Sequence, residues 1–543
     1  MPASSPRQSA TIVLLREGPT APELLMLRRS DASRSFAGAH VFPGGVLDDS
    51  DGDPASLDCL AGLSEVDANG RLKREGGALA CWFAAARECY EEAGILLARD
   101  AAGRFPDAGR LQAWQADRRA IRGRELAFAS FLAREALIVP AGDMLYFDRW
   151  ITPGGLPARF DTHFFIAAAP PGQEARSDGL EATEAIWVTA AEALQRARQG
   201  AMKLRGPTEF ILEGLCRHAT VDAALAHCRD LARVPVNRPR YGCSSDGEPR
   251  MHLEADAAYD EIAWADPDET GSARCELKPG QACTLDRWTR RVLAPNAGMM
   301  TGPGTNSYLV GTEALALIDP GPDEPAHIDA LLRAAGGRLC WILLTHTHID
   351  HSPAVDAVRR ATGAEVCGRP ALHASAHDHG VALDRVLGEG DCIDLGDARL
   401  RALLTPGHAS NHVCYLLEPS GMLFSGDHVL KGMTPVIAPP DGNLAQYLAS
   451  LERLLALDIA VIAPAHGRLV GDPHGNVRAL IAHRMRRHAK VLKAMEQAGP
   501  GADVEALLPL VYPDVPQALL RVARLSLQAH LEYATTSSTL AAG

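Results

Sequence analysis

The chain contains 543 residues, of which 47% are hydrophobic and 22% are charged, and its formal net charge is -13. One hydrophobic core rarely serves more than about 250 to 300 residues, so this length excludes a single-domain protein. The negative net charge disfavours strong nonspecific binding of nucleic acid. It does not exclude a local basic groove. No apolar run reaches the roughly 20 residues of a membrane helix, so we expect no membrane partner.

The N-terminal residues and the cysteines bear on the cellular compartment. The first ten residues, "MPASSPRQSA", lack the apolar segment of a secretory signal. The twelve cysteines are spread from Cys59 to Cys414 without a CxxC pair. This distribution is typical of reduced thiols rather than of a disulfide framework. We therefore expect a cytoplasmic protein.

The first part of the chain alternates short strands with helical segments. Two strands are predicted within residues 11–29, joined by "GPTAPE", and a Gly-rich "FPGG" follows at residues 42–45. Residues 48–77 are rich in Asp, Gly and Ser and predict a surface insertion. After them, "ALACWFAAARECYEEAGILL" has the composition of a long helix that ends at Gly94. More strands and helices are expected up to about residue 232.

Residues 233–284 are irregular and rich in helix breakers, which predicts a linker. From residue 285 to 478, short apolar strands such as "CWILLT" and "MLFSG" recur among helical patterns, an alternation that favours an α/β architecture. A basic stretch, "HRMRRHAKVLKAM", and two further helices occupy residues 479–543. The predicted fold class is thus α/β multidomain.

A first chemical site is predicted in "ARECYEEAGI", where Glu88, Glu91 and Glu92 stand at i, i+3 and i+4 and share one face of a helix. Three adjacent carboxylates repel one another unless a cation lies between them. Mg²⁺ takes oxygen ligands and keeps waters that a phosphate can share. Arg87 is placed to pair with Glu91. The alternative is an ordinary charged helix face in solvent.

Residues 87–95 resemble the second half of the Nudix box, and "FPGG" ending at Gly45 resembles its first half. The spacing between the halves is longer than in the family, which implies an insertion at about residues 48–77. The family's glutamate six residues after the box glycine corresponds to Asp51 or is lost. "RsfaGahvFPGG", with Arg34 and Gly38, is similar to a signature of coenzyme A diphosphatases, most of all the long peroxisomal type.

This resemblance implies that residues 1–232 form a Nudix domain of the α/β/α fold. It implies hydrolysis of a diphosphate bond in coenzyme A or a related nucleoside diphosphate derivative, with Mg²⁺ or Mn²⁺ as the cofactor. Glu88, Glu91 and Glu92 would hold the metal, and Glu91 and Glu92 would be catalytic. Glu181 and Glu184 are candidates for the general base, and equally they fit as surface charges.

A second site is predicted from "LLTHTHIDHSP" and three later positions. A hydrolytic metal centre needs imidazole and carboxylate ligands that converge from several strand ends and leave a position for water. Each candidate comes after a short apolar segment that is predicted to be a strand. The candidates are His346, His348, Asp350, His351, His408, Asp427 and His466. A single histidine is more often a surface or packing residue. Seven such residues in this order favour a metal centre.

This order resembles the pattern of the metallo-β-lactamase superfamily, HxHxDH followed by His, Asp and His. The resemblance implies an αββα sandwich over residues 285–478 with two Zn²⁺, Fe or Mn ions that share one hydroxide. The first ion would be bound by His346, His348 and His408, the second by Asp350, His351 and His466, with Asp427 bridging both. Asp350 is also assigned a catalytic role. Asp319 and His412 resemble residues that support the ligands without binding metal.

Residues 285–535 are similar to the lactamase-β-like 2 subgroup, which implies a winged-helix-like end at residues 479–543 and single-stranded RNA as substrate. Basic residues that would contact phosphates there are Arg484, Arg486, Arg487, Lys490 and Lys493; a solvated basic helix is the alternative. The rival activity is thioester hydrolysis of the glyoxalase II kind on acyl-CoA or acylglutathione. A bifunctional hydrolase is therefore expected. A non-catalytic binding module is disfavoured because both ligand sets are complete.

Overall fold

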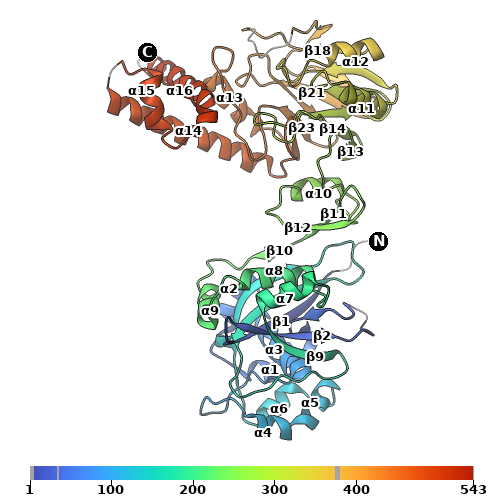
Figure 1. Cartoon of the computed structure of the whole chain (residues 1–543), viewed down its shortest axis with the longest axis vertical. Coiled ribbons are helices and arrows are strands. Elements are labelled where there is room, and N and C mark those ends of the chain that lie inside the picture. Colours follow the sequence, from blue (N-terminus) through green and yellow to red (C-terminus); the bar gives the residue numbers. More distant parts are fainter. Residues whose placement is uncertain (1–4, 34–35, 374–379, 500, 542–543) are drawn as a thin grey trace. The chain divides into compact units, whose positions relative to one another are not determined.

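The computed structural model describes residues 5–33, 36–373, 380–499 and 501–541, with side chains described up to residue 535. Arg34, part of the diphosphatase-like signature, lies outside the described residues. The chain divides into two compact units (Figure 1). The N-terminal unit contains residues 1–241, 251–254 and 268–270, and the C-terminal unit contains residues 242–250, 255–267 and 271–543.

An eight-stranded sheet forms the centre of the N-terminal unit. Strands β1 and β2 confirm the two strands predicted within residues 11–29, and β1 also pairs in parallel with β8, where Ile12 lies opposite Phe165. The strand path is β10 (Val236–Asn237), β7 (Leu145–Ile151), β8 (Phe160–Ala168), β1 (Arg7–Arg16), β2 (Glu23–Arg29) and β3 (His40–Val41), with β4 (Gly44–Val46) on β1 and β9 (Ala182–Thr189) on β2.

Side chains of β1 alternate between two hydrophobic cores, as expected for a strand buried on both faces. Ile12 and Leu14 belong to one core, while Val13 and Leu15 belong to the other. The first core is covered by α3 (Leu79–Glu88), α4 (Ala108–Ala113), α5 (Gln115–Arg122) and α6 (Phe128–Arg134). The second is covered by α7 (Ala190–Arg198), α8 (Gly206–Leu215) and α9 (Val221–Arg229). The unit is therefore a helix–sheet–helix sandwich.

The predicted insertion at residues 48–77 is folded rather than a surface loop. It forms η1 (Asp49–Gly52), α1 (Pro54–Leu57), β5 (Leu60–Ala61), which pairs with β6 (Val139–Pro140), and α2 (Glu65–Leu72). Ala68 and Leu72 are buried in the same core as Trp82 of α3. The insertion thus contributes apolar surface to the domain core, which its polar composition did not indicate.

The predicted long helix ends at Gly94, as expected, but its last turn is wider than an α-helix. After Glu88 the chain continues as a π-helical turn, η2 (Cys89–Ala93), and Gly94 adopts a left-handed conformation with φ of 70°. Glycine tolerates this conformation without strain. Arg118 of α5 donates to the carbonyls of Tyr90 and Glu91 at 2.8 and 3.0 Å, so it satisfies the end of the helix.

Two sheets face each other in the C-terminal unit. The first is β13 (Ala282–Thr284), β14 (Thr289–Leu293), β15 (Asn306–Val310), β16 (Leu315–Ile318), β17 (Leu339–Leu343), β18 (Glu365–Gly368) and β19 (Arg385–Val386). The second is β20 (Cys392–Asp394), β21 (Arg399–Leu404), β22 (Val413–Leu417), β23 (Met422–Gly426) and β24 (Val461–Pro464). The rings of Tyr308 on β15 and Phe424 on β23 meet between the sheets, with centroids 5.1 Å apart.

Helices cover the outer face of each sheet in this unit. Helices α11 (Pro325–Ala335) and α12 (Val355–Thr362) pack on the first sheet through Leu317 and Ile342. Helices α13 (Leu444–Leu454) and α14 (Pro473–Ala498) pack on the second through Cys414 and Leu423. This αββα order confirms the layer arrangement predicted for the C-terminal part.

The chain ends in three helices, α14, α15 (Val504–Val511) and α16 (Leu520–Ala541), with η4 (Gln517–Leu519) before the last. Their shared core contains Val491, Leu507 and Leu527. Helix α14 runs unbroken across the predicted boundary at residue 478. The described residues after Pro473 contain no strand that would form a wing, so the winged-helix-like character is not confirmed.

The predicted linker, residues 233–284, is largely ordered. It carries β10, β11 (Arg240–Cys243), β12 (Pro249–His252), α10 (Tyr259–Ala265) and β13. Glu261 of α10 is buried in the C-terminal unit, where it accepts from Arg291 at 2.7 and 2.8 Å and pairs with Arg468 at 3.1 Å. Within the described part of the chain, no helix combines the length and the apolar character needed to cross a bilayer.

Candidate metal centres

The candidate ligands of the C-terminal unit lie just after strand ends. His346 and His348 follow β17, His408 follows β21, and Asp427 follows β23 directly. His466 follows β24, which runs parallel to β23. Because neighbouring parallel strands end at the same edge, loops far apart in sequence bring their first residues together there. All seven predicted ligands fall into two adjacent groups, His346, His348 and His408, and Asp350, His351, Asp427 and His466.

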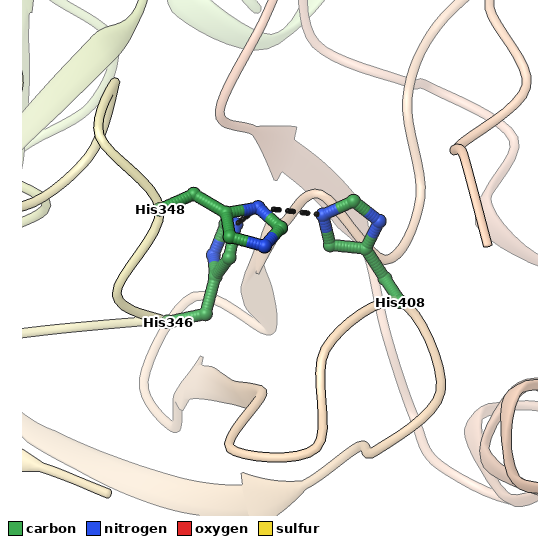
Figure 2. Close-up of side chains that lie close together, drawn as sticks. All are labelled: His346, His348 and His408. Atoms are coloured by element: carbon green, nitrogen blue, oxygen red, sulfur yellow. Dashed lines mark hydrogen bonds between the residues drawn. The ribbon is translucent and has the colours of Figure 1, made fainter. Parts of the chain in front are cut away.

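The three histidines of the first group point their ring nitrogens at one another (Figure 2). Nε2 of His346 lies 2.9 Å from Nδ1 of His348, which lies 3.2 Å from Nε2 of His408. A tetrahedral ion with zinc–nitrogen bonds of about 2.0 to 2.1 Å would hold such nitrogens roughly 3.3 Å apart. Burial lowers the pKa of His346 far below its usual value and that of His348 to about 4. Both rings are thus neutral at physiological pH, which is the form that binds metal.

The second group places two imidazoles against two carboxylates. Nε2 of His466 lies 3.2 Å from Oδ2 of Asp350 and 3.3 Å from Oδ1 of Asp427. Nε2 of His351 lies 3.5 Å from Asp350 and 3.7 Å from Asp427. The Nε2 atoms of both imidazoles and Oδ1 of Asp427 are buried without a hydrogen-bond partner. Buried polar atoms are rarely left unpaired, so this donor set fits a bound cation.

Asp427 is the residue that faces both groups. Its Oδ1 lies toward His466 and His351, while its Oδ2 lies 3.7 Å from Nε2 of His408 in the first group. One carboxylate with an oxygen on each side suits two ions held a few ångströms apart. The geometry is thus compatible with the bridging position predicted for Asp427.

Three of the candidate ligand histidines are oriented by an acceptor at one ring nitrogen. Nδ1 of His351 donates to Asp319 at 2.9 Å, Nδ1 of His408 donates to the carbonyl of Val436 at 2.6 Å, and Nδ1 of His466 donates to the carbonyl of Gly304 at 3.2 Å. Such partners fix the tautomer and leave Nε2 free to bind metal.

Asp319 is buried beside the first ligands and is itself held in place. Its two oxygens accept from the backbone and the hydroxyl of Thr345 at 2.8 and 2.7 Å. That hydroxyl lies 3.0 Å from Nδ1 of His346. Asp319 therefore connects His346 and His351 without lying in either group of candidate ligands.

The carboxylates hold charge on two of the imidazoles. Burial opposes protonation of both rings. For His351 the charges of Asp350, Asp319 and Asp427 outweigh burial and hold the pKa well above its usual value. For His466 the carboxylates of Asp427 and Asp350 raise the pKa to about 9. A divalent cation would neutralise the charge of the same carboxylates. Its binding would therefore release the protons held by His351 and His466.

Two further histidines line the centre. Nδ1 of His412 lies 2.8 Å from the Thr405 hydroxyl, and a Cβ at Gly426 would come within 2.6 Å of its Nε2, so only glycine allows this approach. His428 was not predicted from the sequence. It is fully buried, neither ring nitrogen has a partner, and burial lowers its pKa to about 3. The only signal for it was its position directly after Asp427.

In the N-terminal unit, Arg87 connects three carboxylates. Its Nε and Nη2 donate to the two oxygens of Asp51 at 2.8 and 2.9 Å, and its Nη1 donates to Glu88 at 2.8 Å and Glu91 at 3.2 Å. The predicted pairing of Arg87 with Glu91 is present. The sequence did not decide whether Asp51 corresponds to the family's glutamate. Its side chain is fully buried, and it is the main partner of Arg87.

The Gly-rich segment lies against the other carboxylates. The backbone N–H of Gly44 donates to Glu92 at 3.0 Å, and a Cβ on Gly45 would lie 2.5 Å from the carboxyl group of Glu88. Burial raises the pKa of Glu88 to about 7, and it raises those of Glu91 and Glu92 as well, Glu92 most strongly. Such desolvated acids gain from a cation that restores their charged form.

The three glutamates are less convergent than the ligands of the C-terminal unit. Among the described residues, only the two groups in that unit bring three or more candidate ligand atoms within 4.8 Å of one another. Arg87 occupies the space between Glu88 and Glu91, while Glu92 faces Gly44. Glu181 and Glu184, the candidate bases, are exposed, and the charge of Glu181 contributes to the raised pKa of Glu92.

The C-terminal unit is thus an αββα sandwich that gathers five histidines and two aspartates near its strand ends, in two groups that could each hold a metal ion. Residues 300–466 match the model of the Metallo-beta-lactamase superfamily. The lactamase-like protein vrtG of Penicillium aethiopicum is 32% identical over 276 residues, which cover 49% of this chain and 86% of that protein. The chain belongs to the metallo-β-lactamase superfamily.

Two further relatives are similar over a shorter range. The lactamase-like protein adaB of Aspergillus niger is 35% identical over 213 residues, which cover 38% of this chain and 64% of that protein. The atrochrysone carboxyl ACP thioesterase dmxR1 of Cryptosporiopsis sp. is 33% identical over 212 residues, which cover 38% of this chain and 62% of that protein. The chain thus spans less than two thirds of the length of these two relatives.

Solved structures also resemble parts of the chain. The metallo-β-lactamase family protein TTHA1429 from Thermus thermophilus is 22% identical with a TM-score of 0.40, and the match covers 47% of this chain and 95% of that one. A NUDIX hydrolase from Alicyclobacillus acidocaldarius is 28% identical with a TM-score of 0.35, and the match covers 41% of this chain and 96% of that one.

Proposed function

We propose that the C-terminal unit is a dinuclear metal-dependent hydrolase that cleaves thioesters of the acyl-CoA, acyl carrier or acylglutathione kind. The observation that carries the proposal is the convergence of seven ligand side chains, three of which present buried atoms without a hydrogen-bond partner. The relatives named as thioesterases support the substrate class.

The ligand roles follow from the two groups. His346, His348 and His408 would hold one ion, Asp350, His351 and His466 the other, and Asp427 would span both. Two bound divalent cations supply Lewis acidity that lowers the pKa of a shared water and polarises the scissile carbonyl. Zn²⁺, Fe and Mn all suit a mixed imidazole and carboxylate set.

The remaining residues of the centre position these ligands. Asp319 and the carbonyls of Val436 and Gly304 fix the rings of His351, His408 and His466. Asp350 lies at the edge of its group with about a quarter of its side chain exposed, so it is placed to accept a proton from an incoming water.

The test is the metal content and hydrolytic activity of the Asp427→Asn variant. We expect the parent protein to contain close to two metal ions and to hydrolyse acyl-CoA or lactoylglutathione, and the variant to lose most of both. Asp458→Asn, which changes an exposed aspartate of the same unit, is the matched control. Full thioester hydrolysis by Asp427→Asn would end the proposal.

Single-stranded RNA cleavage is the second candidate for this unit, and the burial of part of its predicted phosphate-binding set disfavours it. Arg484 is buried and Arg487 is half-buried, which leaves Arg486, Lys490 and Lys493 as the exposed cations of the predicted phosphate-binding set. An RNA arm in the same assay, with both aspartate variants, compares the two activities directly.

For the N-terminal unit we propose Mg²⁺-dependent hydrolysis of a diphosphate bond, in coenzyme A or a related nucleoside diphosphate derivative. The supporting observation is the set of desolvated carboxylates around Arg87, with Glu92 held by the backbone of Gly44. Mg²⁺ or Mn²⁺ would be held by Glu88, Glu91 and Glu92 and would polarise the phosphoryl oxygens. Together the two units would act on the two ends of an acyl-CoA.

The double variant Glu91→Gln with Glu92→Gln tests this second activity. We expect it to lose Mg²⁺-dependent release of nucleotide from coenzyme A while thioester hydrolysis by the C-terminal unit continues. Unchanged diphosphate hydrolysis in this variant contradicts the assignment of these glutamates.

A further inference from the structure

A cavity of about 190 Å³ lies in the C-terminal unit, between α14, the start of α16 and the segment around Pro435. An engineered cavity of roughly 150 Å³ in another protein accommodates benzene, so this one has room for a ring or a short aliphatic chain. The cavity belongs to neither ligand group. One lining residue, Val436, connects it to the candidate metal centre, since its carbonyl accepts from His408.

One wall of the cavity carries a buried, incompletely paired cation. Arg484 is 4% exposed, its Nη2 donates to the carbonyl of Pro435, and its Nε is buried with no hydrogen-bond partner. Nδ1 of the neighbouring His483 is also buried without a partner. None of the residues that line the cavity carries a carboxylate. A buried cation without a counter-charge is costly, so the site favours an anion.

A second guanidinium is held in a fixed orientation at the same cavity. Arg487 donates to the carbonyl of Val511 at 3.1 Å, and its guanidinium lies 4.2 Å from the centre of the Tyr512 ring. Guanidinium groups bind carboxylates and phosphates through paired hydrogen bonds, and stacking on a ring reduces the entropy lost on binding. Two arginines one turn apart on α14 thus face one small space.

Part of the lining is apolar. Leu519 of η4 and Val522 of α16 line the cavity together with Val515. Inorganic phosphate alone would leave this surface uncovered, whereas an apolar body attached to the anion would cover it. The basic residues of α14 thus lie in two different environments. Arg484 and Arg487 line the cavity, whereas Arg486 is exposed to solvent.

We propose that this cavity is a binding site for a small organic anion with an apolar body, such as a short-chain carboxylate or alkyl phosphate. Arg487 and Arg484 bind the anionic group, and Leu519 and Val522 contact the apolar part. The site is separate from the proposed metal centre, and its occupancy does not depend on either proposed activity.

The test is calorimetric titration of the full chain with hexanoate, hexyl phosphate and hexanol. We expect the two anions to bind in the millimolar range or tighter and hexanol to bind at least about tenfold more weakly, because it lacks the charge. Arg487→Gln should weaken binding of the anions about tenfold, whereas the matched control Arg486→Gln, on the exposed face of the same helix, should leave it unchanged.

A second variant keeps the proposal testable if Arg487→Gln perturbs folding. Val522→Phe fills the apolar side without removing a charge and should also abolish binding. Anion binding that persists in both Arg487→Gln and Val522→Phe means that the anion binds elsewhere, including at the metal centre, and overturns the proposal. Equal affinity for hexanol, or no heat with any anion at millimolar concentration, overturns it as well.

Discussion

Arg87 and Asp51 form a buried two-point ion pair in the N-terminal unit, with nitrogen to oxygen distances of 2.8 and 2.9 Å. The pair joins the insertion to the glutamate-bearing helix, and it fixes the guanidinium that also contacts Glu88 and Glu91. The orientation of these carboxylates therefore depends on a residue within the insertion.

Asp51→Asn is expected to destabilise the N-terminal unit by about 3 to 5 kcal/mol, because it leaves the charge of Arg87 buried without its main partner. Denaturant unfolding of the variant measures this loss. Asp49→Asn changes an exposed aspartate of the same short helix and should have almost no effect. A difference below about 1 kcal/mol between the two variants would contradict the importance of the pair.

Gly45→Ala tests the close contact between the Gly-rich segment and the carboxylates. The added Cβ would lie 2.5 Å from the Glu88 carboxyl group, so that carboxylate must move while the backbone can stay in place. We expect a clear loss of Mg²⁺ affinity in a metal titration with little change in stability. Gly70→Ala, at a glycine with open space around it, is the control. Equal Mg²⁺ affinity in both variants argues against metal binding at Glu88.

Asp319→Asn tests the support of the ligand His351. The variant replaces a carboxylate oxygen that accepts from Nδ1 of His351, so the ring loses its fixed orientation. Loss of such a partner typically lowers metal affinity about 10- to 100-fold. Titration with zinc against a competing chelator measures this directly, and Asp323→Asn, at an exposed position, is the control. Unchanged zinc affinity in Asp319→Asn would show that His351 needs no such support.

His530 predicts a pH dependence of stability for the C-terminal helices. The ring is 1% exposed, neither nitrogen has a hydrogen-bond partner, and burial lowers its pKa to about 3 from 6.5. Between these values the unfolded chain binds a proton that the folded chain does not, so the free energy of unfolding falls as the pH decreases. At pH 5 this amounts to about 2 kcal/mol.

His530→Phe should remove this contribution, so its unfolding transition should change less between pH 8 and pH 5 than that of the parent protein. Scanning calorimetry at the two pH values measures the difference. His227→Phe, at an exposed position on α9, should keep the pH dependence of the parent. Identical pH dependence in His530→Phe and the parent would assign the acid sensitivity to other groups.

The seven candidate ligands of the C-terminal unit were selected from sequence alone, and the structure brings them together for a physical reason. His346, His408 and Asp427 each follow a short apolar run, and in an α/β sandwich such runs are strands whose ends meet at one edge. Local patterns therefore identified residues that lie together in space. His428 was missed because a buried histidine next to a candidate ligand has no spacing signal of its own.

The N-terminal unit was predicted less completely because the insertion interrupts its motif. The insertion at residues 48–77 changes the spacing between Gly45 and Arg87. The sequence therefore did not decide whether Asp51 takes the place of the family's glutamate, although the structure places Asp51 in direct contact with Arg87. Burial was the other obstacle. Arg484 and Arg486 are equivalent in a sequence, and only the packing of α14 shows that one lines a cavity and the other faces solvent.

Helix α14 begins against α13 and the second sheet, with Val477 and Leu480 in that core, and continues to Ala498 beside α15. A chain shortened to end at residue 478 would be cut inside this helix and would lose Arg484, the donor to Pro435, next to the carbonyl that orients His408. Minimal versions of the catalytic part should therefore retain the last three helices, because truncation there is expected to impair metal loading as well as solubility.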